Sequence, residues 1–116
     1  MTEIFVFGSN LAGRHGKGAA LHAKWFYGAE QGTGFGPTGR AYAIPTKNEY
    51  LKTLSLNEIE LYVRMFKHYA RSRPDLTFLL TPIGCGLAGY KPHQIGPMFK
   101  DSPSNVIMPR EFVSYV

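Results

Sequence analysis

Two glycine-rich segments are the parts of this 116-residue sequence whose composition points most directly to chemistry. Residues 13–18 read Gly-Arg-His-Gly-Lys-Gly and lead into good helix formers, and residues 84–89 read Gly-Cys-Gly-Leu-Ala-Gly. Backbone N–H groups approach an anion closely where side chains are missing, and a helix N-terminus adds unpaired donors with a partial positive charge. We expect both segments to contact phosphate; the alternative for each is a plain tight turn.

Two well-known phosphate-binding motifs fit the first segment poorly. Residues 8–15 have glycines spaced as in a P-loop, but Arg14 replaces its lysine and His15 replaces the Ser or Thr that holds magnesium. The dinucleotide-binding fingerprint does not align in register either. The sequence therefore favours neither a P-loop ATPase nor a Rossmann dehydrogenase.

Three single side chains are further candidates for chemistry. Lys47 ends an apolar segment and is either a counter-charge for phosphate or a solvated lysine. His15 is the histidine best placed to be a general acid or a phosphate contact. Cys85 has no base near it in the sequence, so a small packed side chain is favoured over a nucleophile. The four histidines show no metal-ligand spacing with cysteine or carboxylates, so we expect no metal and no other cofactor.

Short apolar runs must form the strands that carry these groups. We expect strands at residues 4–7, 41–47, 76–81 and 106–109. The run at 76–81 is nearly continuous, which is typical of a strand covered on both faces. Residues 28–40 hold five glycines and a proline, so we expect a surface loop there.

Helices are expected between these strands. Residues 18–28 hold good helix formers and no proline, and a weaker helix is expected at 92–99. Ser55 and Glu58 have the spacing of a capping box, and apolar residues then recur at three- and four-residue intervals as far as Pro74. We place the aromatic residues of that helix in the core; they are Tyr62, Phe66 and Tyr69.

The alternation of strands and helices predicts the α/β class, with a mostly parallel mixed sheet between helices on both faces, because parallel neighbours need crossover connections. A chain of this size has room for one core, so residues 1–116 should form one compact three-layer α/β/α domain. Ligands of such sheets bind beyond the carboxyl ends of the strands. Residues 9–18, 46–47 and 84–89 all leave strands at that end, and we expect them to meet.

Composition narrows the partners only in part. Hydrophobic residues make up 44% of the chain and charged residues 18%, as in a folded protein, and a single cysteine excludes an internal disulfide. The net charge of +5 favours anionic partners. Because the basic residues are dispersed, nucleic acid is an open alternative but not the favoured one. The sequence shows no membrane span and no leader peptide, so we expect a cytoplasmic protein with no membrane partner; it indicates no oligomeric state.

Three motifs resemble those of macrodomains, in the order in which that family has them. Residues 16–20, Gly-Lys-Gly-Ala-Ala, resemble the family's glycine-alanine turn, and residues 42–47, Tyr-Ala-Ile-Pro-Thr-Lys, resemble its second-strand segment. Residues 81–90 are close to its Ile-Gly-Cys-Gly-Leu-Ala-Gly loop, and residues 7–16 look like the opening of small bacterial and phage proteins with a macro-like domain. The resemblance implies ADP-ribose binding, and some members hydrolyse bonds of ADP-ribose.

The resemblance also implies which residues bind. By position, Ser9 and Asn10 would lie near the distal ribose, residues 16–20 near the ribose and diphosphate, and residues 84–89 over the phosphates. The ligand-binding residues expected in this way are Ser9, Asn10, Gly16, Lys17, Gly18, Ala19, Thr46, Gly84, Cys85, Gly86, Leu87, Ala88, Gly89 and Tyr90.

A hydrolase would rely on Lys47, which looks like the lysine with which one glycohydrolase branch attacks the distal ribose. An amine attacks only when it is deprotonated. In the protein hydrolases of that branch an aspartate follows the Gly-Cys-Gly-Leu run, and Ala88 stands there in this sequence. Asn10 is then the candidate for positioning water, with His15 as acid and Glu49 as an alternative base. The activities implied are ADP-ribosyl hydrolase and ADP-ribose-1″-phosphate phosphatase. The chain is short for the family's six-stranded sheet, so a strand should be missing at one or both edges.

Phosphate contacts alone are too weak for a nucleotide site. A helix terminus contributes up to ~2 kcal/mol, against ~8 kcal/mol for micromolar binding. Stacking of a base on an aromatic ring adds ~1–3 kcal/mol, and Phe35, Tyr42 and Tyr90 are the candidate rings. Two other functions stay open: a non-enzymatic module that binds nucleic acid or a host protein, and a pocket that sequesters a signalling nucleotide.

Overall fold

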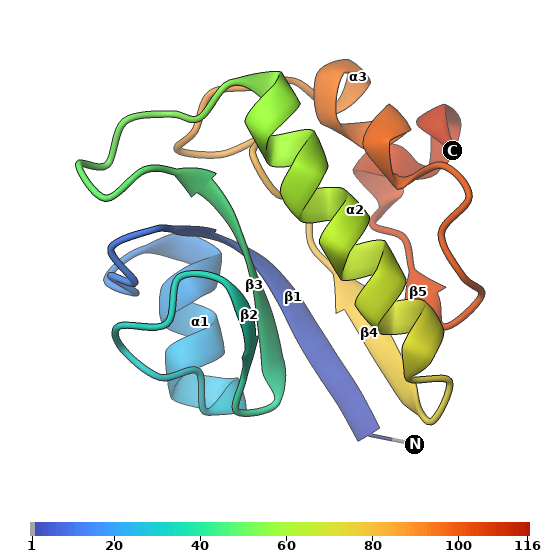
Figure 1. Ribbon diagram of the computed structural model, residues 1–116, viewed down its shortest axis with the longest axis horizontal. Coiled ribbons are helices and arrows are strands. Elements are labelled where there is room, and N and C mark those ends of the chain that lie inside the picture. Colours follow the sequence, from blue (N-terminus) through green and yellow to red (C-terminus); the bar gives the residue numbers. More distant parts are fainter. Residues whose placement is uncertain (1) are drawn as a thin grey trace.

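Five strands form one mixed sheet in the computed structural model, which describes residues 2–116 (Figure 1). The spatial order is β2-β3-β1-β4-β5, and each neighbouring pair is parallel except β2 with β3. The mostly parallel sheet predicted from the sequence is therefore confirmed. The strands are β1 (Thr2–Asn10), β2 (Gly36–Thr38), β3 (Ala41–Lys47), β4 (Leu76–Leu80) and β5 (Val106–Ile107).

Alternate residues of the central strand β1 belong to two separate cores. Ile4 and Val6 join a cluster with α2 (Leu56–Ser72), whereas Phe7 joins a smaller cluster with α1 (Gly18–Tyr27). The α2 side is also covered by α3 (Pro92–Ile95) and by the 3₁₀ helices η1 (Gly96–Phe99) and η2 (Arg110–Tyr115), whose buried residues belong to the larger cluster. Helices thus lie on both faces of the sheet.

The longest helix follows directly from its sequence signals. The Ser55 side chain accepts a hydrogen bond from the Glu58 N–H, and the Glu58 carboxylate accepts one from the Ser55 N–H, which is the expected capping box. Phe66 is fully buried and meets Phe78 of β4 edge-on, with ring centroids 5.5 Å apart. No helix among the described residues is both long and apolar enough to cross a bilayer.

The structure corrects four details of the expected elements. Residues 28–40 are not all loop, because β2 pairs with β3 there; an edge strand needs donors on one side only, so it tolerates Pro37. Only one face of β4 is fully covered, since its residues alternate between buried and half-buried. Tyr62 and Tyr69 pack at the margin of the core and are half-buried. The run at 106–109 forms only a two-residue strand, β5.

The order of connections creates the crevice that holds the site. From β1 the chain crosses one face through α1 and reaches β3, then crosses the other face through α2 and returns to β4 on the far side of β1 (Figure 1). In parallel sheets, binding sites form where successive connections diverge in this way. The carboxyl ends of β1, β3 and β4 all border that place.

Candidate functional site

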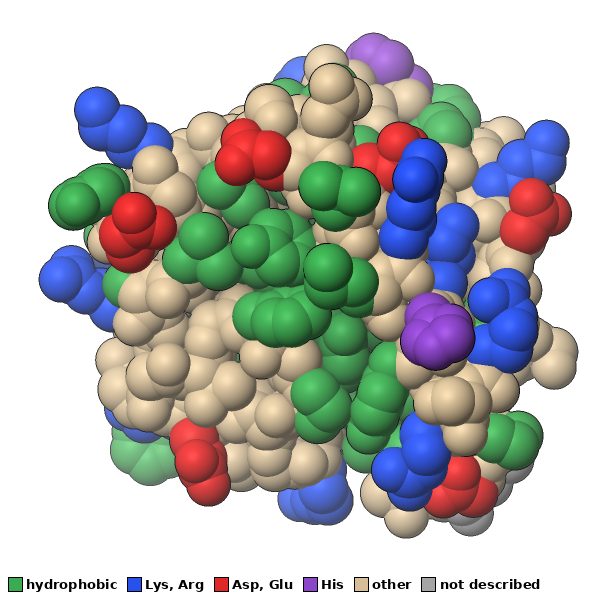
Figure 2. Space-filling view, viewed as in Figure 1, with side chains coloured by type: hydrophobic (Ala, Val, Ile, Leu, Met, Phe, Trp, Pro, Cys, Tyr) green, Lys and Arg blue, Asp and Glu red, His purple; other side chains and the backbone are tan. Residues whose placement is uncertain are grey.

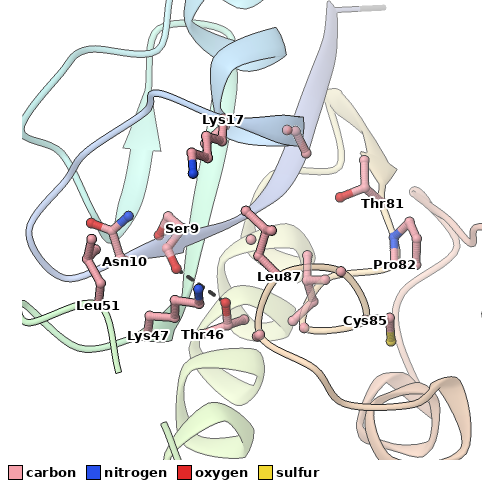
Figure 3. Close-up of a pocket in the computed structure, with 18 of the residues that line it drawn as sticks. Ser9, Asn10, Lys17, Thr46, Lys47, Leu51, Thr81, Pro82, Cys85 and Leu87 are labelled. Carbon is pink, nitrogen blue, oxygen red and sulfur yellow. Dashed lines mark hydrogen bonds between the residues drawn. The ribbon is translucent and has the colours of Figure 1, made fainter. Parts of the chain in front are cut away.

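A cavity of about 630 Å³ lies at the carboxyl ends of β1, β3 and β4 (Figure 3). This volume is within the ordinary range of small-molecule sites. Both glycine-rich segments contribute to its wall, although almost seventy residues separate them in the sequence. Its lining residues are Gly8, Ser9, Asn10, Arg14, Gly16, Lys17, Gly18, Ala19, Ala20, Thr46, Lys47, Leu51, Thr81, Pro82, Ile83, Gly84, Cys85, Gly86, Leu87 and Ala88.

The charged side chains that line the cavity are all positive. They belong to Arg14, Lys17 and Lys47, and no Asp or Glu among residues 2–116 lines it. Figure 3 shows Lys17 at the start of α1 and Lys47 at the end of β3. Like charges around one hollow raise its positive potential, which favours an anionic ligand.

The N-terminus of α1 opens on the same cavity without a cap. Its N-cap residue Lys17 makes no side-chain cap bond, and the first turn holds no acidic residue. Within the described chain, nothing accepts a hydrogen bond from the N–H groups of residues 18–20, all of which line the cavity. Gly18 has φ 56°, a backbone conformation that suits glycine. Unpaired N–H groups and a helix dipole are the features that a helix N-terminus offers to an anion.

The segment 84–89 supplies backbone donors and no charge. Its own turn uses three N–H groups, those of Cys85, Gly89 and Tyr90, in bonds to backbone carbonyls. The N–H groups of residues 86–88 have no acceptor within the described chain, and these residues line the cavity. The wall opposite α1 therefore presents a second set of unpaired donors.

The polar residues at the ends of β1 and β3 build the floor of the cavity. The Ser9 hydroxyl donates to the Gly34 carbonyl, and the Thr46 hydroxyl donates to the Ser9 carbonyl at 3.3 Å (dashed line in Figure 3). Asn10 lines the cavity, but its amide group bonds to both the N–H and the carbonyl of Arg14 at 3.0 Å. Asn10 therefore closes the turn between β1 and the first glycine-rich segment, which argues against the expected role in positioning water.

The structure corrects the expected roles of four other residues. His15 is fully buried and does not line the cavity; it points into the core because its Nε2 lies 2.9 Å from the Thr33 carbonyl oxygen. Tyr90 is turned away, since its hydroxyl donates to the Leu54 carbonyl at 2.6 Å, and Gly89 is also outside the lining. Glu49 is exposed and outside the lining as well.

The expected stacking platform is absent from the cavity wall. Tyr42 lies in the core and Phe35 packs on Tyr62, with ring centroids 5.1 Å apart. None of the aromatic residues in the described chain lines the cavity. Exposed aliphatic side chains take their place, namely Leu51 and Leu87.

Leu51 is a lining residue that the sequence did not reveal. It has φ 63°, which is unusual for a leucine and marks a strained turn. Asn48 holds that turn, because its side-chain oxygen accepts bonds from the N–H groups of Tyr50 and Lys52. The Thr53 hydroxyl then donates to the Ala88 carbonyl at 3.0 Å and joins this turn to the second glycine-rich segment. Asn48 is the sequence signal that could have predicted this turn, since asparagine often organises turns in this way.

Cys85 lines the cavity and is half-buried. Burial, assisted by the Glu111 carboxylate, raises the pKa of the Cys85 thiol, so the neutral thiol predominates near pH 7 and a nucleophilic role is disfavoured.

Among residues 2–116, no group of three His, Cys, Asp or Glu side chains is arranged to hold a metal ion. Comparison with protein-family models, curated proteins and solved structures gives no match.

Proposed function

We propose that this protein binds an ADP-ribose-like nucleotide in the cavity, with the diphosphate between the start of α1 and residues 86–88. One observation carries the proposal: two distant glycine-rich segments line one cavity together with three cationic side chains, and no carboxylate among residues 2–116 lines it. Unpaired N–H groups on both walls match the oxygens of a diphosphate, which faces two sides at once. The motif resemblance to macrodomains supports the same class of ligand.

Apolar walls add to the affinity that the phosphate contacts supply. Burying apolar surface contributes ~25 cal/mol per Å², so ~150 Å² adds almost 4 kcal/mol to the ~2 kcal/mol of a partly buried helix terminus. Leu51, Leu87 and the half-buried Pro82 provide such surface. The sugar or base is therefore expected to contact aliphatic side chains, and specificity for a particular base is expected to be weak.

Calorimetry tests the proposal with ADP-ribose, ADP, AMP and adenosine. ADP-ribose and ADP should bind most tightly and adenosine most weakly, because adenosine makes no phosphate contact. Lys17→Ala should weaken the two diphosphate ligands, whereas Lys100→Ala, at an exposed lysine outside the cavity, should leave them unchanged. Absence of heat for every ligand at about millimolar concentration would remove the proposal.

Hydrolysis of a ribosyl bond is the second candidate, because the half-buried Lys47 enters the cavity wall. No carboxylate or histidine within the described chain lines the cavity, so Lys47 would act without a neighbouring base of those types. Lys47→Arg keeps the positive charge but removes the nucleophilic amine. It should keep ADP-ribose affinity and abolish release of ADP-ribose from an ADP-ribosylated protein or oligonucleotide. Undiminished release by Lys47→Arg would exclude Lys47 as the nucleophile.

A further inference from the structure

His15 stands in the middle of the first glycine-rich segment, yet its side chain points away from the cavity that its neighbours line. Its ring is 0% exposed and meets the Phe7 ring of β1 edge-on, with centroids 5.3 Å apart. Arg14 and Gly16, on either side of it in the sequence, both line the cavity. A buried polar ring in a glycine-rich surface segment therefore needs a reason other than ligand contact.

That reason lies in residues 30–34, which hold the first segment in place. The His15 Nε2 lies 2.9 Å from the Thr33 carbonyl oxygen, and the His15 N–H donates to the Gln31 side-chain oxygen at 3.2 Å. The Gly32 N–H also donates to the Gly13 carbonyl at 2.8 Å. We call these three bonds the latch. The latch adds to the local bonds that Asn10 of β1 makes with residues 13–14, so residues 30–34 hold the part of the segment that bears His15.

The contact between the two segments leaves no room for a side chain. A Cβ atom at Gly13 would overlap the backbone of Gly32, and a Cβ atom at Gly34 would overlap the Asn10 carbonyl. The Ser9 hydroxyl adds a bond to the Gly34 carbonyl. Backbone segments packed this closely have few alternative arrangements. We therefore expect loss of the His15 bond to loosen the whole first segment rather than to shift it slightly.

The protonation state of the ring follows from its partners. A carbonyl oxygen can only accept, so Nε2 carries the proton, and the buried Nδ1 has no partner within the described chain. Burial lowers the pKa of His15 and Lys24 of α1 lowers it further, against the opposing effect of the Thr33 bond. Around the ring, β1 contributes apolar Phe7 and residues 30–34 contribute the neutral Gln31 and Thr33; the charge that acts on it is Lys24. A proton on Nδ1 would be buried without an acceptor.

We propose that His15 is a positioning residue whose neutral imidazole locks the cation-bearing segment against residues 30–34, and that protonation of its ring opens this latch. Opening moves Arg14, Lys17 and the donors at the start of α1 away from the opposite wall. Anion binding in the cavity is therefore lost in mild acid. This last step rests on the proposed function, whereas the latch itself does not.

Hydrogen–deuterium exchange of the hydrogen-bonded amides of residues 13–15 tests the latch without any ligand. In the unmodified protein, the exchange rate relative to that of His15→Phe at the same pH should rise about tenfold when the pH is lowered from about 7.5 to about 5. His15→Gln keeps a donor near the Nε2 position but does not titrate, so it should stay protected at both pH values. His15→Phe keeps the ring volume without the donor and serves as the unlatched control; circular dichroism verifies that it is folded. Exchange at about pH 7.5 that is as slow in His15→Phe as in the unmodified protein overturns the proposal.

The ligand arm uses ADP-ribose, whose diphosphate has no terminal phosphate group to titrate over this range. Affinity should fall about threefold from about pH 7.5 to about pH 5 in the unmodified protein and should change little in His15→Gln. His22→Gln, at an exposed histidine of α1, is the matched control and should keep the full pH dependence. An equal loss of affinity in His15→Gln overturns the proposal. If the exchange rates change with pH as expected but ADP-ribose binds at neither pH, the proposed function is wrong and the role of His15 in the latch is still supported.

Discussion

The two glycine-rich walls of the cavity have similar compositions but different construction. The first, residues 13–18, carries Arg14 and Lys17 and is held by bonds to residues 30–34, including those of the buried His15. The second, residues 84–89, carries no charge and closes on itself through short-range backbone bonds. The first wall thus adds several long-range bonds to position charge, whereas the second positions its N–H groups mainly by local turn geometry, with one long-range bond from Thr53 to Ala88.

Glycine therefore serves a different purpose in each of the two walls. At Gly13 it permits one backbone to lie against another, and its φ of 70° adds a conformation that side chains disfavour. At Gly86 a Cβ atom would meet nothing within 4 Å, so this glycine leaves space on the ligand side. Stability should therefore be sensitive to substitution in the first wall, and ligand affinity in the second.

The sharpest test of that contrast is a pair of alanine substitutions. Gly13→Ala should lower the free energy of unfolding by about 3–4 kcal/mol, because the new methyl group overlaps the Gly32 backbone and the φ angle is positive. Gly86→Ala should change it by less than about 0.5 kcal/mol. Urea unfolding at neutral pH measures both. Equal losses from the two variants would show that the walls are not built differently.

Charge reversal tests whether the ligand is attracted by the local charge of the first wall or only by the net charge of the protein. Lys17→Glu should weaken ADP-ribose binding about a hundredfold, or about 2.8 kcal/mol, since an attraction at the start of α1 becomes a repulsion. Lys100→Glu makes the same change in net charge at an exposed site outside the cavity and should leave the affinity within about twofold. Similar losses in both variants, measured by calorimetry, would mean that net charge rather than local geometry attracts the ligand.

A smaller effect is expected where the second wall meets the rest of the fold. Tyr90→Phe removes the hydroxyl that bonds the Leu54 carbonyl at 2.6 Å, and should lower the free energy of unfolding by about 1 kcal/mol. ADP-ribose affinity should stay within about threefold, because residues 84–89 close their turn through their own backbone bonds. A loss of affinity larger than that of Lys17→Glu would show that the second wall also depends on long-range support.

Local signals predicted most of the regular elements. The helix after Ser55 and the helix ending at Gly28 form as expected, because a capping box and a left-handed glycine are interactions between residues close in sequence. The strand at 41–47 also has the predicted bounds. β2 escaped prediction because Gly36 and Pro37 disfavour a strand, and its pairing with β3 is what makes it one.

The candidate site was predictable to the extent that strand ends converge. Alternation of elements and the placement of glycines led to one cavity lined by residues 16–20, 46–47 and 84–88. The direction of individual side chains was not predictable, as His15 and Asn10 show. His15 turns inward and Asn10 closes a turn because of bonds to Thr33 and Arg14. Such bonds depend on where the backbone places the partner.

The amino-acid order by itself determined the α/β class, the mostly parallel sheet and the end of the sheet where the glycine-rich segments emerge, because hydrophobic periodicity and crossover geometry are carried by short stretches of chain. Only the tertiary structure decided which polar groups face the cavity and which serve the fold. Burial and hydrogen-bond partners come from segments distant in sequence, and they turned a candidate catalytic histidine into a buried support for the cationic wall.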